Sequence, residues 1–224
     1  MAADKQVPVI AIDGPSGSGK GTVSRILAQK LGWHYLDSGA LYRLVAYAAV
    51  NAGTALDSEA ALAAIASSMA VVFDQSDGRV LLNGRDVSDD IRSESCGNGA
   101  SQVAALPAVR QALLQWQRAC RRAPGLVGDG RDMGSVVFID AQLKIFLTAS
   151  AEERARRRYK QLKEKGVNVS LGPILQGIEA RDLRDSQRKT APLVAAADAV
   201  VLDTTAMSVD AVISEIEARW AAVG

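Results

Sequence analysis

Apolar runs that alternate with amphipathic stretches dominate the hydrophobic pattern of this chain. Residues 7–13 form an apolar, β-branched run that predicts a buried strand, and residues 20–31 carry apolar positions at helical spacing. The alternation continues with strands predicted near residues 33–36, 126–128, 144–149 and 199–202, and helices near 38–50, 107–121, 151–165, 173–190 and 208–222. This pattern predicts the α/β class, with a five-stranded parallel sheet flanked by helices.

Between residues 57 and 105 the hydrophobic period changes. An alanine-rich stretch at 57–69 predicts a helix, and short alternating runs at 71–74, 79–82 and 85–87 then predict an antiparallel meander. Its turns are expected at 76–78 and at Asn83-Gly84. We expect Ser88 to cap a short turn through Ile91, residues 97–99 to form a flexible joint, and residues 100–105 to form a helical fragment. The chain therefore carries a β-rich insert.

A glycine-rich segment, residues 14–22, joins the first strand to the first helix. Strand, glycine loop, lysine and helix form the P-loop arrangement, in which backbone N–H groups and a helix N-terminus bind phosphate. Gly14, Gly17 and Gly19 allow the backbone to bend, and Lys20 supplies a mobile cation for the β and γ phosphate oxygens. The usual Ser or Thr after the lysine is replaced by Gly21, so the hydroxyl comes from residue 22. The segment predicts binding of a nucleoside triphosphate.

The stretch after the second predicted strand places an arginine near a helix N-terminus. Ser38 is a predicted N-cap for the helix that ends near Val50, and Arg43 lies in its first two turns. A helix dipole disfavours a cation at that end. The dipole makes an anionic ligand for Arg43 worth considering. Because the Ser-Gly-x-x-Tyr-Arg stretch follows the second strand of a P-loop unit, such a ligand is favoured over a solvated side chain.

A polar cluster follows the predicted strand at 126–128. It contains Asp129, Arg131 and Asp132. In doubly wound sheets, ligands bind beyond the carboxyl ends of the strands. We therefore expect these three side chains to lie near the glycine loop rather than in a plain surface turn.

Two helices in the last third of the chain are rich in arginine. The first carries Arg154, Arg156, Arg157 and Arg158, and in the second Arg181, Arg184 and Arg188 recur at helical spacing. Neighbouring glutamates are also compatible with a solvated, ion-paired surface. Phosphoryl transfer relies on cations aimed at the transferred group, so a basic lid over the glycine loop is the favoured interpretation.

Composition excludes several classes of function. Aromatic residues make up 4% of the chain and the formal net charge is +1, which disfavours a binding platform for long nucleic acids. No apolar run is long enough to cross a membrane, and no signal peptide is evident, so a cytoplasmic protein is expected. Cys96 and Cys120 are expected to be free thiols, and His34 is the only histidine, which argues against histidine-based catalysis or a multi-histidine metal site.

Five segments make the chain resemble the bacterial cytidylate kinases, over nearly its whole length. They are residues 14–22, 36–43, 128–134, 152–158 and 181–188. The resemblance implies a P-loop kinase fold and transfer of the γ-phosphoryl group of ATP to CMP or dCMP, with Mg²⁺, in pyrimidine nucleotide metabolism. It also implies a single domain over residues 1–224, with an acceptor-binding region at about 38–105 and a lid at about 154–188. No apolar patch or heptad pattern indicates an oligomer, so a monomer is expected.

The same resemblance implies roles for particular residues. The catalytic residues would be Lys20, Arg131, Arg157 and Arg158. The ATP-binding residues would be Gly14, Pro15, Ser16, Gly17, Ser18, Gly19, Lys20, Gly21 and Thr22. The CMP-binding residues would be Ser38, Arg43, Ser101, Arg110, Asp129, Arg131, Asp132, Arg181, Asp185 and Arg188. Phosphates and water would provide most of the ligands of Mg²⁺, and Thr22 is the candidate protein ligand. No dedicated metal site is expected.

The chemistry of cytosine supports the residues assigned to the base. Arg110, Asp132 and Arg188 would surround it, with Arg43 and Arg131 on the acceptor phosphate. Cytosine presents an N4 amine donor beside its N3 and O2 acceptors, so a carboxylate can accept from the amine while arginine donates to the acceptors. Uracil presents O4 and N3–H instead, which predicts discrimination against UMP.

Three other functions are alternatives to a cytidylate kinase. A P-loop kinase for a small hydroxylated metabolite usually carries Ser or Thr after the lysine, and Gly21 argues against it. A GTPase would need an Asn-Lys-x-Asp guanine motif, which the chain lacks. A nucleotide-binding regulator without turnover is disfavoured by the intact Lys20 and the complete set of arginines.

Overall fold

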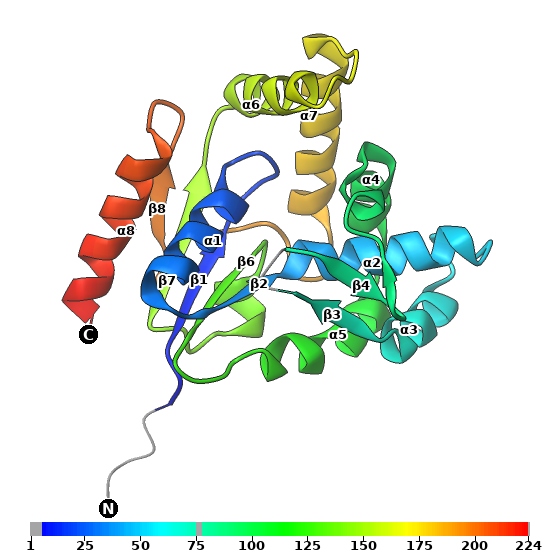
Figure 1. Ribbon diagram of the computed structural model, residues 1–224, viewed down its shortest axis with the longest axis horizontal. Helices are drawn as coiled ribbons and strands as arrows, with labels where there is room; N and C mark the ends of the chain where they lie inside the picture. Colours follow the sequence, from blue (N-terminus) through cyan, green and yellow to red (C-terminus); the bar gives the residue numbers. More distant parts are fainter. Residues whose placement is uncertain (1–5, 75–77, 224) are drawn as a thin grey trace, which may run out of the picture. The chain divides into compact units, whose positions relative to one another are not determined.

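The computed structural model describes residues 6–74 and 78–223 (Figure 1). The chain divides into two compact units, which we describe separately. One consists of Met1–Leu36 and Cys120–Gly224 and is called the sheet unit here. The other, Asp37–Ala119, is called the insert unit.

The sheet unit is built on a five-stranded sheet with the strand order β2-β6-β1-β7-β8. The strands are β1 (Val9–Asp13), β2 (His34–Asp37), β6 (Leu126–Gly130), β7 (Leu143–Thr148) and β8 (Val200–Asp203). β1 pairs in parallel with β6 and β7, and β7 pairs in parallel with β8. The predicted five-stranded parallel sheet flanked by helices is confirmed.

Burial of the central strands explains their continuous apolar pattern. Every residue of β1 is buried. Helices α1 (Lys20–Leu31) and α8 (Val209–Val223) contribute to the same hydrophobic core, which includes Leu27 of the first, Ile213 of the second and Ile12 of the sheet. Gly32 ends α1 in the left-handed conformation, with φ of 65°, as its predicted role as a C-cap requires.

The register of the strands sets which residues meet at the carboxyl edge of the sheet. Asp13 lies opposite Gly130 of β6 and Phe146 of β7, and Ile12 lies opposite Asp129. The segments that leave β1 and β6 therefore start side by side. The glycine loop and the polar cluster at 129–132 are the two segments that this register brings together.

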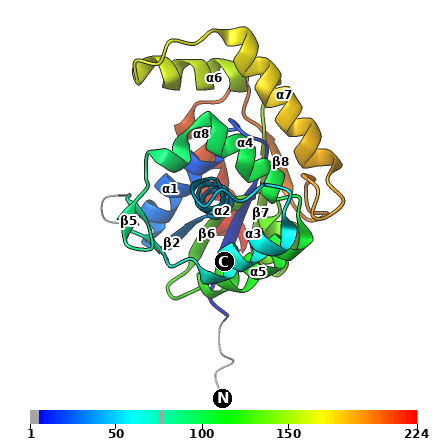
Figure 2. The ribbon, with the colours of Figure 1, turned by 90° about the vertical axis from the view of Figure 1, so that its right-hand side faces the viewer.

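Helices α6 (Ala151–Glu164) and α7 (Leu171–Gln187) follow β7 in the sequence and pack against each other (Figure 2). The Ser150 side chain caps α6 by accepting a hydrogen bond from the Glu153 backbone N–H. The prediction that the second helix reaches residue 190 is wrong. It ends at Gln187, because Arg188 adopts an extended conformation with φ of −62° and ψ of 139°.

The insert unit contains the predicted meander and four helices. Its strands β3 (Val71–Phe73), β4 (Val80–Leu82) and β5 (Arg85–Asp86) form an antiparallel three-stranded sheet, and its helices are α2 (Ser38–Asn51), α3 (Glu59–Ser68), α4 (Glu94–Val103) and α5 (Pro107–Ala119). Asn83 and Gly84 both have positive φ, 50° and 82°, as the expected tight hairpin turn requires. Residues 75–77, within the other predicted turn, lie outside the described residues.

Two predicted caps in the insert unit, Ser38 and Ser88, are wrong. Asp37, not Ser38, caps α2, because its carboxylate accepts from the Ala40 N–H at 3.0 Å. Ser88 caps no helix and accepts from the Val80 N–H at 2.9 Å, while a 3₁₀ turn forms at Asp90–Arg92.

The predicted flexible joint at residues 97–99 is instead part of a regular helix. Ser93 caps α4, which runs through both glycines. A Cβ atom at Gly99 would lie 3.1 Å from the Cβ of Ala46 in α2 and 3.2 Å from Leu56. The glycine therefore serves close packing of α4 against α2, which local sequence cannot distinguish from a joint.

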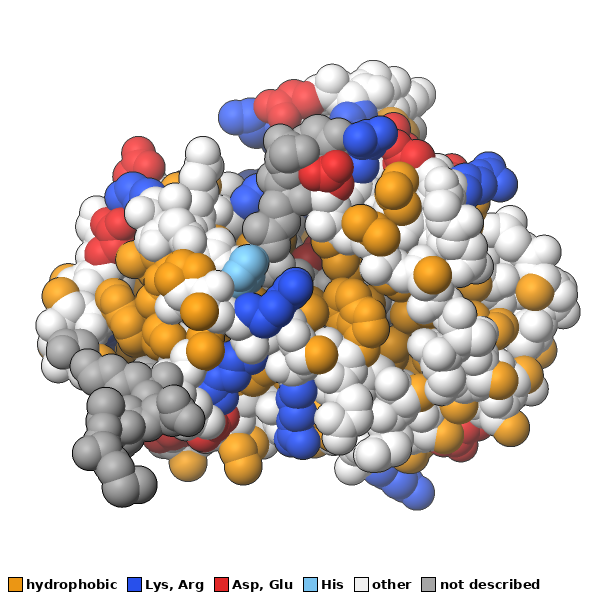
Figure 3. Space-filling model, turned by 60° about the horizontal axis from the view of Figure 1, so that its bottom comes forward, with side chains coloured by type: hydrophobic (Ala, Val, Ile, Leu, Met, Phe, Trp, Pro, Cys, Tyr) orange, Lys and Arg blue, Asp and Glu red, His pale blue; other side chains and the backbone are white. Residues whose placement is uncertain are grey.

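Hydrophobic side chains on the face drawn in Figure 3 are interspersed with polar and basic ones. The exposed large apolar residues come from separate elements; Ile139, Leu183 and Val201 are examples. Among the helices of the described part, none combines the length and apolar character needed to span a bilayer.

Candidate functional site

At three positions, the glycine loop after β1 adopts a backbone conformation that residues other than glycine rarely adopt. Gly14, Gly17 and Gly19 have φ values of 151°, 79° and 91°. A Cβ at Gly14 would lie 2.1 Å from the carbonyl oxygen of Leu147 in β7, and one at Gly17 would lie 3.0 Å from the Cβ of Arg154. Packing and backbone conformation both require the glycines, so the loop is a tightly held structure.

Lys20 is the first residue of α1 and turns back over the loop. Its Nζ donates to the carbonyl oxygen of Pro15 at 3.2 Å. The helix begins after Gly19, which is left-handed, and no side chain of the described residues caps it. The positive end of the helix dipole and the ammonium group therefore meet at the same loop, an arrangement suited to a phosphate chain.

The glycine that departs from the usual motif faces a buried carboxylate. A Cβ at Gly21 would lie 3.2 Å from Oδ2 of Asp129. Tyr35 of β2 donates to Oδ1 of the same carboxylate at 3.4 Å. From the sequence, Gly21 was only a marker of the family. The structure shows a steric reason for a glycine at this position. The absence of a side chain at Gly21 accommodates the carboxylate at the end of β6.

Arg154 of α6 is a buried connection between the glycine loop and the second arginine-rich helix. Its guanidinium donates to the carbonyl oxygens of Ala149 at 2.9 Å and Ser16 at 3.2 Å. It also pairs with Asp182 of α7 at 2.6 Å, with the arginine side chain 6% exposed. The sequence placed Arg154 among the lid arginines with no role of its own. The contacts indicate that it holds the loop and α7 in place.

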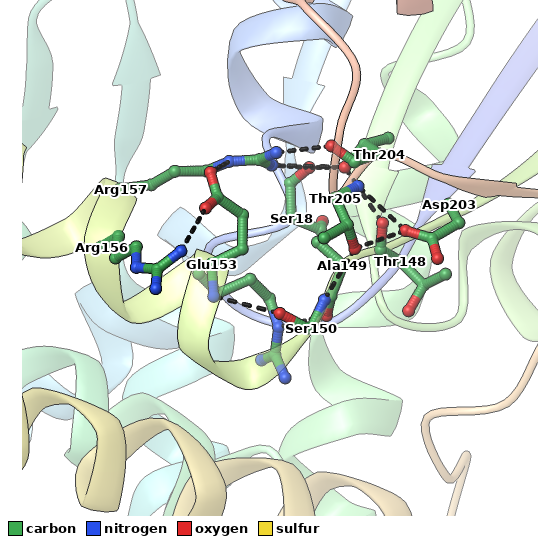
Figure 4. Close-up of polar contacts among 11 residues, drawn as sticks. Ser18, Thr148, Ala149, Ser150, Glu153, Arg156, Arg157, Asp203, Thr204 and Thr205 are labelled. Atoms are coloured by element: carbon green, nitrogen blue, oxygen red, sulfur yellow. Dashed lines mark hydrogen bonds and ion pairs between the residues drawn. The ribbon is translucent and has the colours of Figure 1, made fainter.

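Arg157 also lies against the glycine loop (Figure 4). Its guanidinium donates to the carbonyl oxygens of Ser18 at 3.4 Å and Thr204 at 2.5 Å, and its Nε pairs with Glu153 at 3.1 Å. Arg158 donates to Gln161 at 3.4 Å. The structure thus places one of the two predicted catalytic arginines of α6 at the loop and shows the other in contact with its own helix.

Replacing Arg154 by alanine is expected to lower the free energy of unfolding by about 3 kcal/mol, because Asp182 loses its partner in a largely buried pair. The KM for ATP should rise as well, since the Ser16 carbonyl loses its donor. Denaturant unfolding and steady-state kinetics measure the two effects. Arg156→Ala is the matched control on the same helix: its side chain is 70% exposed and should change stability by less than about 0.5 kcal/mol. Equal effects of the two substitutions would contradict the role given to Arg154.

Apart from Asp129, the predicted acceptor residues of the sheet unit form two ion-paired groups. In the first, Nε of Arg131 lies 3.0 Å and Nε of Arg181 lies 3.8 Å from Oδ2 of Asp185, a buried carboxylate of α7. In the second, Nη2 of Arg188 lies 3.9 Å from Oδ1 of Asp132, and both side chains are almost fully buried. Residues 131 and 132 follow β6, so α7 and the turn after β6 meet as the predicted site requires.

The remaining predicted acceptor residues belong to the insert unit. Arg43 of α2 donates to the carbonyl oxygens of Ile91 at 2.7 Å and Ser93 at 3.3 Å. Arg110 of α5 is buried, and its guanidinium lies 5.8 Å from the ring centroid of Tyr42. Ser38 and Ser101 are also buried. Arg43 and Arg110 are therefore held by contacts within this unit, and the assignment of all four residues to one ligand stays a prediction.

Asp13 is a site residue that sequence reasoning missed. It ends β1 immediately before the glycine loop, and its two carboxylate oxygens accept hydrogen bonds from the backbone N–H groups of Met133 and Gly134, each at 2.8 Å. Burial raises its pKa to about 6, against the lowering effect of those two hydrogen bonds. The only signal in the sequence was an acidic residue at the end of an otherwise apolar strand.

One hydroxyl of the loop region is placed where it could contact a Mg²⁺ ion that is held by phosphates and water. Thr22 is exposed in the first turn of α1, where its hydroxyl could meet a metal held by phosphates. Within the residues that the structure describes, no group of three or more His, Cys, Asp or Glu side chains is arranged to hold a metal ion.

Comparison with known proteins identifies related chains. The family model described as Cytidylate kinase matches residues 10–221. The cytidylate kinase of Pseudomonas aeruginosa is 63% identical over 214 residues, which are 94% of this chain and 93% of that protein. The cytidylate kinases of Stutzerimonas stutzeri and Methylococcus capsulatus are each 61% identical, over 95% and 92% of this chain and 94% of theirs. The matched residues include both units.

Proposed function

This chain belongs to the cytidylate kinase family, and on that premise we propose that it transfers the γ-phosphoryl group of ATP to CMP or dCMP. The products are ADP and CDP or dCDP. The buried pair of Asp132 and Arg188 beside the end of β6 is the observation that carries the choice of cytosine. Its carboxylate accepts a hydrogen bond from the N4 amine, and its guanidinium donates to the ring acceptors.

Residues 14–22 hold the donor nucleotide. The backbone of the glycine loop surrounds the phosphates, and Lys20 moves its ammonium from the Pro15 carbonyl to the β and γ oxygens. Thr22 is the candidate protein ligand for Mg²⁺, which would neutralise charge on the phosphate oxygens when bound. The positive end of the α1 dipole attracts the phosphates of the donor, as the Lys20 ammonium does.

The acceptor nucleotide binds through its phosphate, its sugar and its base. Arg43 and Arg131 bind its phosphate, because a planar guanidinium matches phosphate geometry. Ser38 and Asp129 are further contacts at the phosphate end of the acceptor. Ser101, Arg181 and Asp185 bind the sugar. Arg110 joins Asp132 and Arg188 around the base. In the structure Arg131 and Arg181 both lie near Asp185, which supports a shared role for these three side chains.

The reaction needs no general base, because the attacking acceptor oxygen is already anionic near neutral pH. Catalysis therefore depends on alignment and on cations aimed at the transferred group, here Lys20, Arg131, Arg157 and Arg158. The contact of Arg157 with the Ser18 carbonyl supports its place beside the loop. About residues 154–188, from helices α6 and α7 and their connection, form a lid that excludes water during transfer.

Three broader features of the enzyme remain proposals. We assign about residues 38–105 to acceptor binding within a single functional domain. We also propose that it acts as a monomer. A cytoplasmic location is supported by two free thiols, Cys96 and Cys120, which suit a reducing compartment.

An assay of ADP formation with ATP and CMP, dCMP, UMP or AMP tests the function. Activity with CMP and dCMP is expected, together with CDP or dCDP as product. ATP hydrolysis without a nucleoside diphosphate product, or a preference for AMP, would refute the proposal.

The purified enzyme should show a kcat/KM for CMP that exceeds that for UMP by at least about tenfold. Uracil directs its O4 acceptor toward the Asp132 carboxylate and its N3–H donor toward arginine, so buried polar groups are left poorly paired. Steady-state kinetics at saturating ATP measure the ratio. Equal specificity constants for the two nucleotides would refute the role of Asp132 in reading the base.

A further inference from the structure

We propose that Asp13 is a positioning residue that holds Asp132 in place and so sets the selectivity for cytosine over uracil. The inference rests on the proposed function, because it requires Asp132 to read the base. Asp13 itself contacts no part of the acceptor in this scheme. It acts through the backbone of the turn that follows Asp132.

The hydrogen bonds of Asp13 fall on the two residues directly after Asp132. Met133 and Gly134 each donate a backbone N–H to one carboxylate oxygen at 2.8 Å. These residues begin a π-helical turn, Met133–Val137, and Asp132 occupies the position before it with φ of −150° and ψ of 24°. Asp132 is the N-cap residue by position, but its own side chain does not cap the turn. The Asp13 carboxylate from β1 accepts from the first two backbone N–H groups instead, as a capping side chain would, and so fixes the backbone directly after Asp132.

Close packing leaves the turn little freedom to move by itself. Asp13 and Asp132 are 6% and 3% exposed. A Cβ at Gly134 would lie 3.1 Å from both Cγ and Cδ of Lys144. The aliphatic part of the lysine thus packs against the turn, while its Nζ donates to the Ile139 carbonyl at 2.7 Å. The turn is contacted by both the Asp13 carboxylate and the lysine stem, so loss of the carboxylate removes one of these two restraints.

Two charged groups face Asp13 and act in opposite directions. Asp132 raises its pKa through repulsion, and Lys20 at the start of α1 lowers it. The charged groups of the neighbouring strands have other partners, Tyr35 for Asp129 of β6 and Asp198 for Lys144 of β7. Burial is the largest influence and raises the pKa to about 6. A proton on Asp13 makes one oxygen a poor acceptor, so the turn loses part of its cap in mildly acidic solution.

The substitution Asp13→Asn tests the proposal, since the amide keeps the shape but presents NH₂ to one of the two backbone N–H donors. The ratio of kcat/KM for CMP to that for UMP is expected to fall about tenfold, the effect of losing one buried charge-assisted hydrogen bond. Asp140→Asn is the control, because Asp140 is a surface carboxylate paired with Arg121 and should leave the ratio unchanged. Equal losses for CMP and UMP in Asp13→Asn, with the ratio kept, would show a merely structural role and overturn the proposal.

A double-mutant cycle identifies the route of the effect. In an Asp132→Asn background, Asp13→Asn should cause no further change in the CMP to UMP ratio, because the group that it positions is already gone. Additive changes in the ratio would overturn the proposal. A wild-type enzyme without any preference for CMP would instead refute the assignment of Asp132, so the two failures are distinguishable.

The wild-type enzyme supplies a second test that does not depend on the folding of a variant. Its CMP to UMP ratio should fall as the pH decreases through about 6, where Asp13 gains a proton. Both acceptors carry the same 5′-phosphate, so ionisation of that group cancels in the ratio. A constant ratio between pH 5 and pH 8, measured while the protein remains folded by circular dichroism, would overturn the proposal.

Discussion

Replacing Lys20 by alanine is expected to lower kcat for ATP and CMP by about a thousandfold, the scale on which loss of one aimed donor slows a reaction in a preorganised site. The side chain is the first of α1 and its ammonium already lies over the glycine loop, 3.2 Å from the Pro15 carbonyl. The fold should persist, because Lys20 is partly exposed and contributes nothing to the hydrophobic core. Single-turnover kinetics and circular dichroism measure the two outcomes.

Lys30 provides the matched control in the same helix. It lies in the last turn of α1 and pairs with Glu217 at 2.9 Å, with half of its side chain exposed. Lys30→Ala should leave kcat within about twofold of the wild type, since a surface ion pair contributes little. Near-normal turnover in Lys20→Ala, or equal losses in both variants, would refute the catalytic role of Lys20.

Replacing Gly14 by alanine is expected to abolish ATP binding and to lower the free energy of unfolding by more than about 3 kcal/mol. The added Cβ would lie 2.1 Å from the carbonyl oxygen of Leu147, which belongs to β7 and cannot withdraw without disturbing the sheet. The φ of 151° is itself unfavourable for alanine. Calorimetric titration with a non-hydrolysable ATP analogue and denaturant unfolding measure the effects.

Gly53→Ala separates the steric conflict from backbone strain. Gly53 also has positive φ, 66°, but a Cβ there would meet nothing within 4 Å. Its substitution should lower stability by only about 1 kcal/mol and leave ATP binding intact. If Gly14→Ala is no worse than this control, the contact with Leu147 does not constrain the loop.

Local patterns were sufficient for most of the architecture. The β-branched run before Gly14 predicted β1, and helical spacing followed by Gly32 predicted both the existence and the end of α1. Asn83-Gly84 predicted the hairpin between β4 and β5. These predictions succeeded because strand period, helix period and positive φ are properties of a few neighbouring residues.

Predictions failed where two local solutions competed. Asp37 and Ser38 are both good N-caps, and the backbone selects the first, whose carboxylate reaches the Ala40 N–H. Gly97 and Gly99 are typical of a joint, yet Gly99 is a contact point between two helices. The deciding interactions involve residues distant in sequence, so no local pattern records them.

The sequence by itself determined the strand, glycine loop and helix around Lys20, the β-rich insert and the residues that resemble a cytidylate kinase. These depend on short-range backbone preferences and on motifs with fixed spacing. Only the tertiary structure decided that Gly21 accommodates the Asp129 carboxylate, that Arg154 joins the loop to Asp182, and that Asp13 caps the turn after Asp132. Each of these contacts joins elements that the parallel sheet brings together, with Asp13 and Met133 separated by 120 positions. Burial there makes an unpaired polar group costly, so distant partners, not local preference, fix how these side chains act.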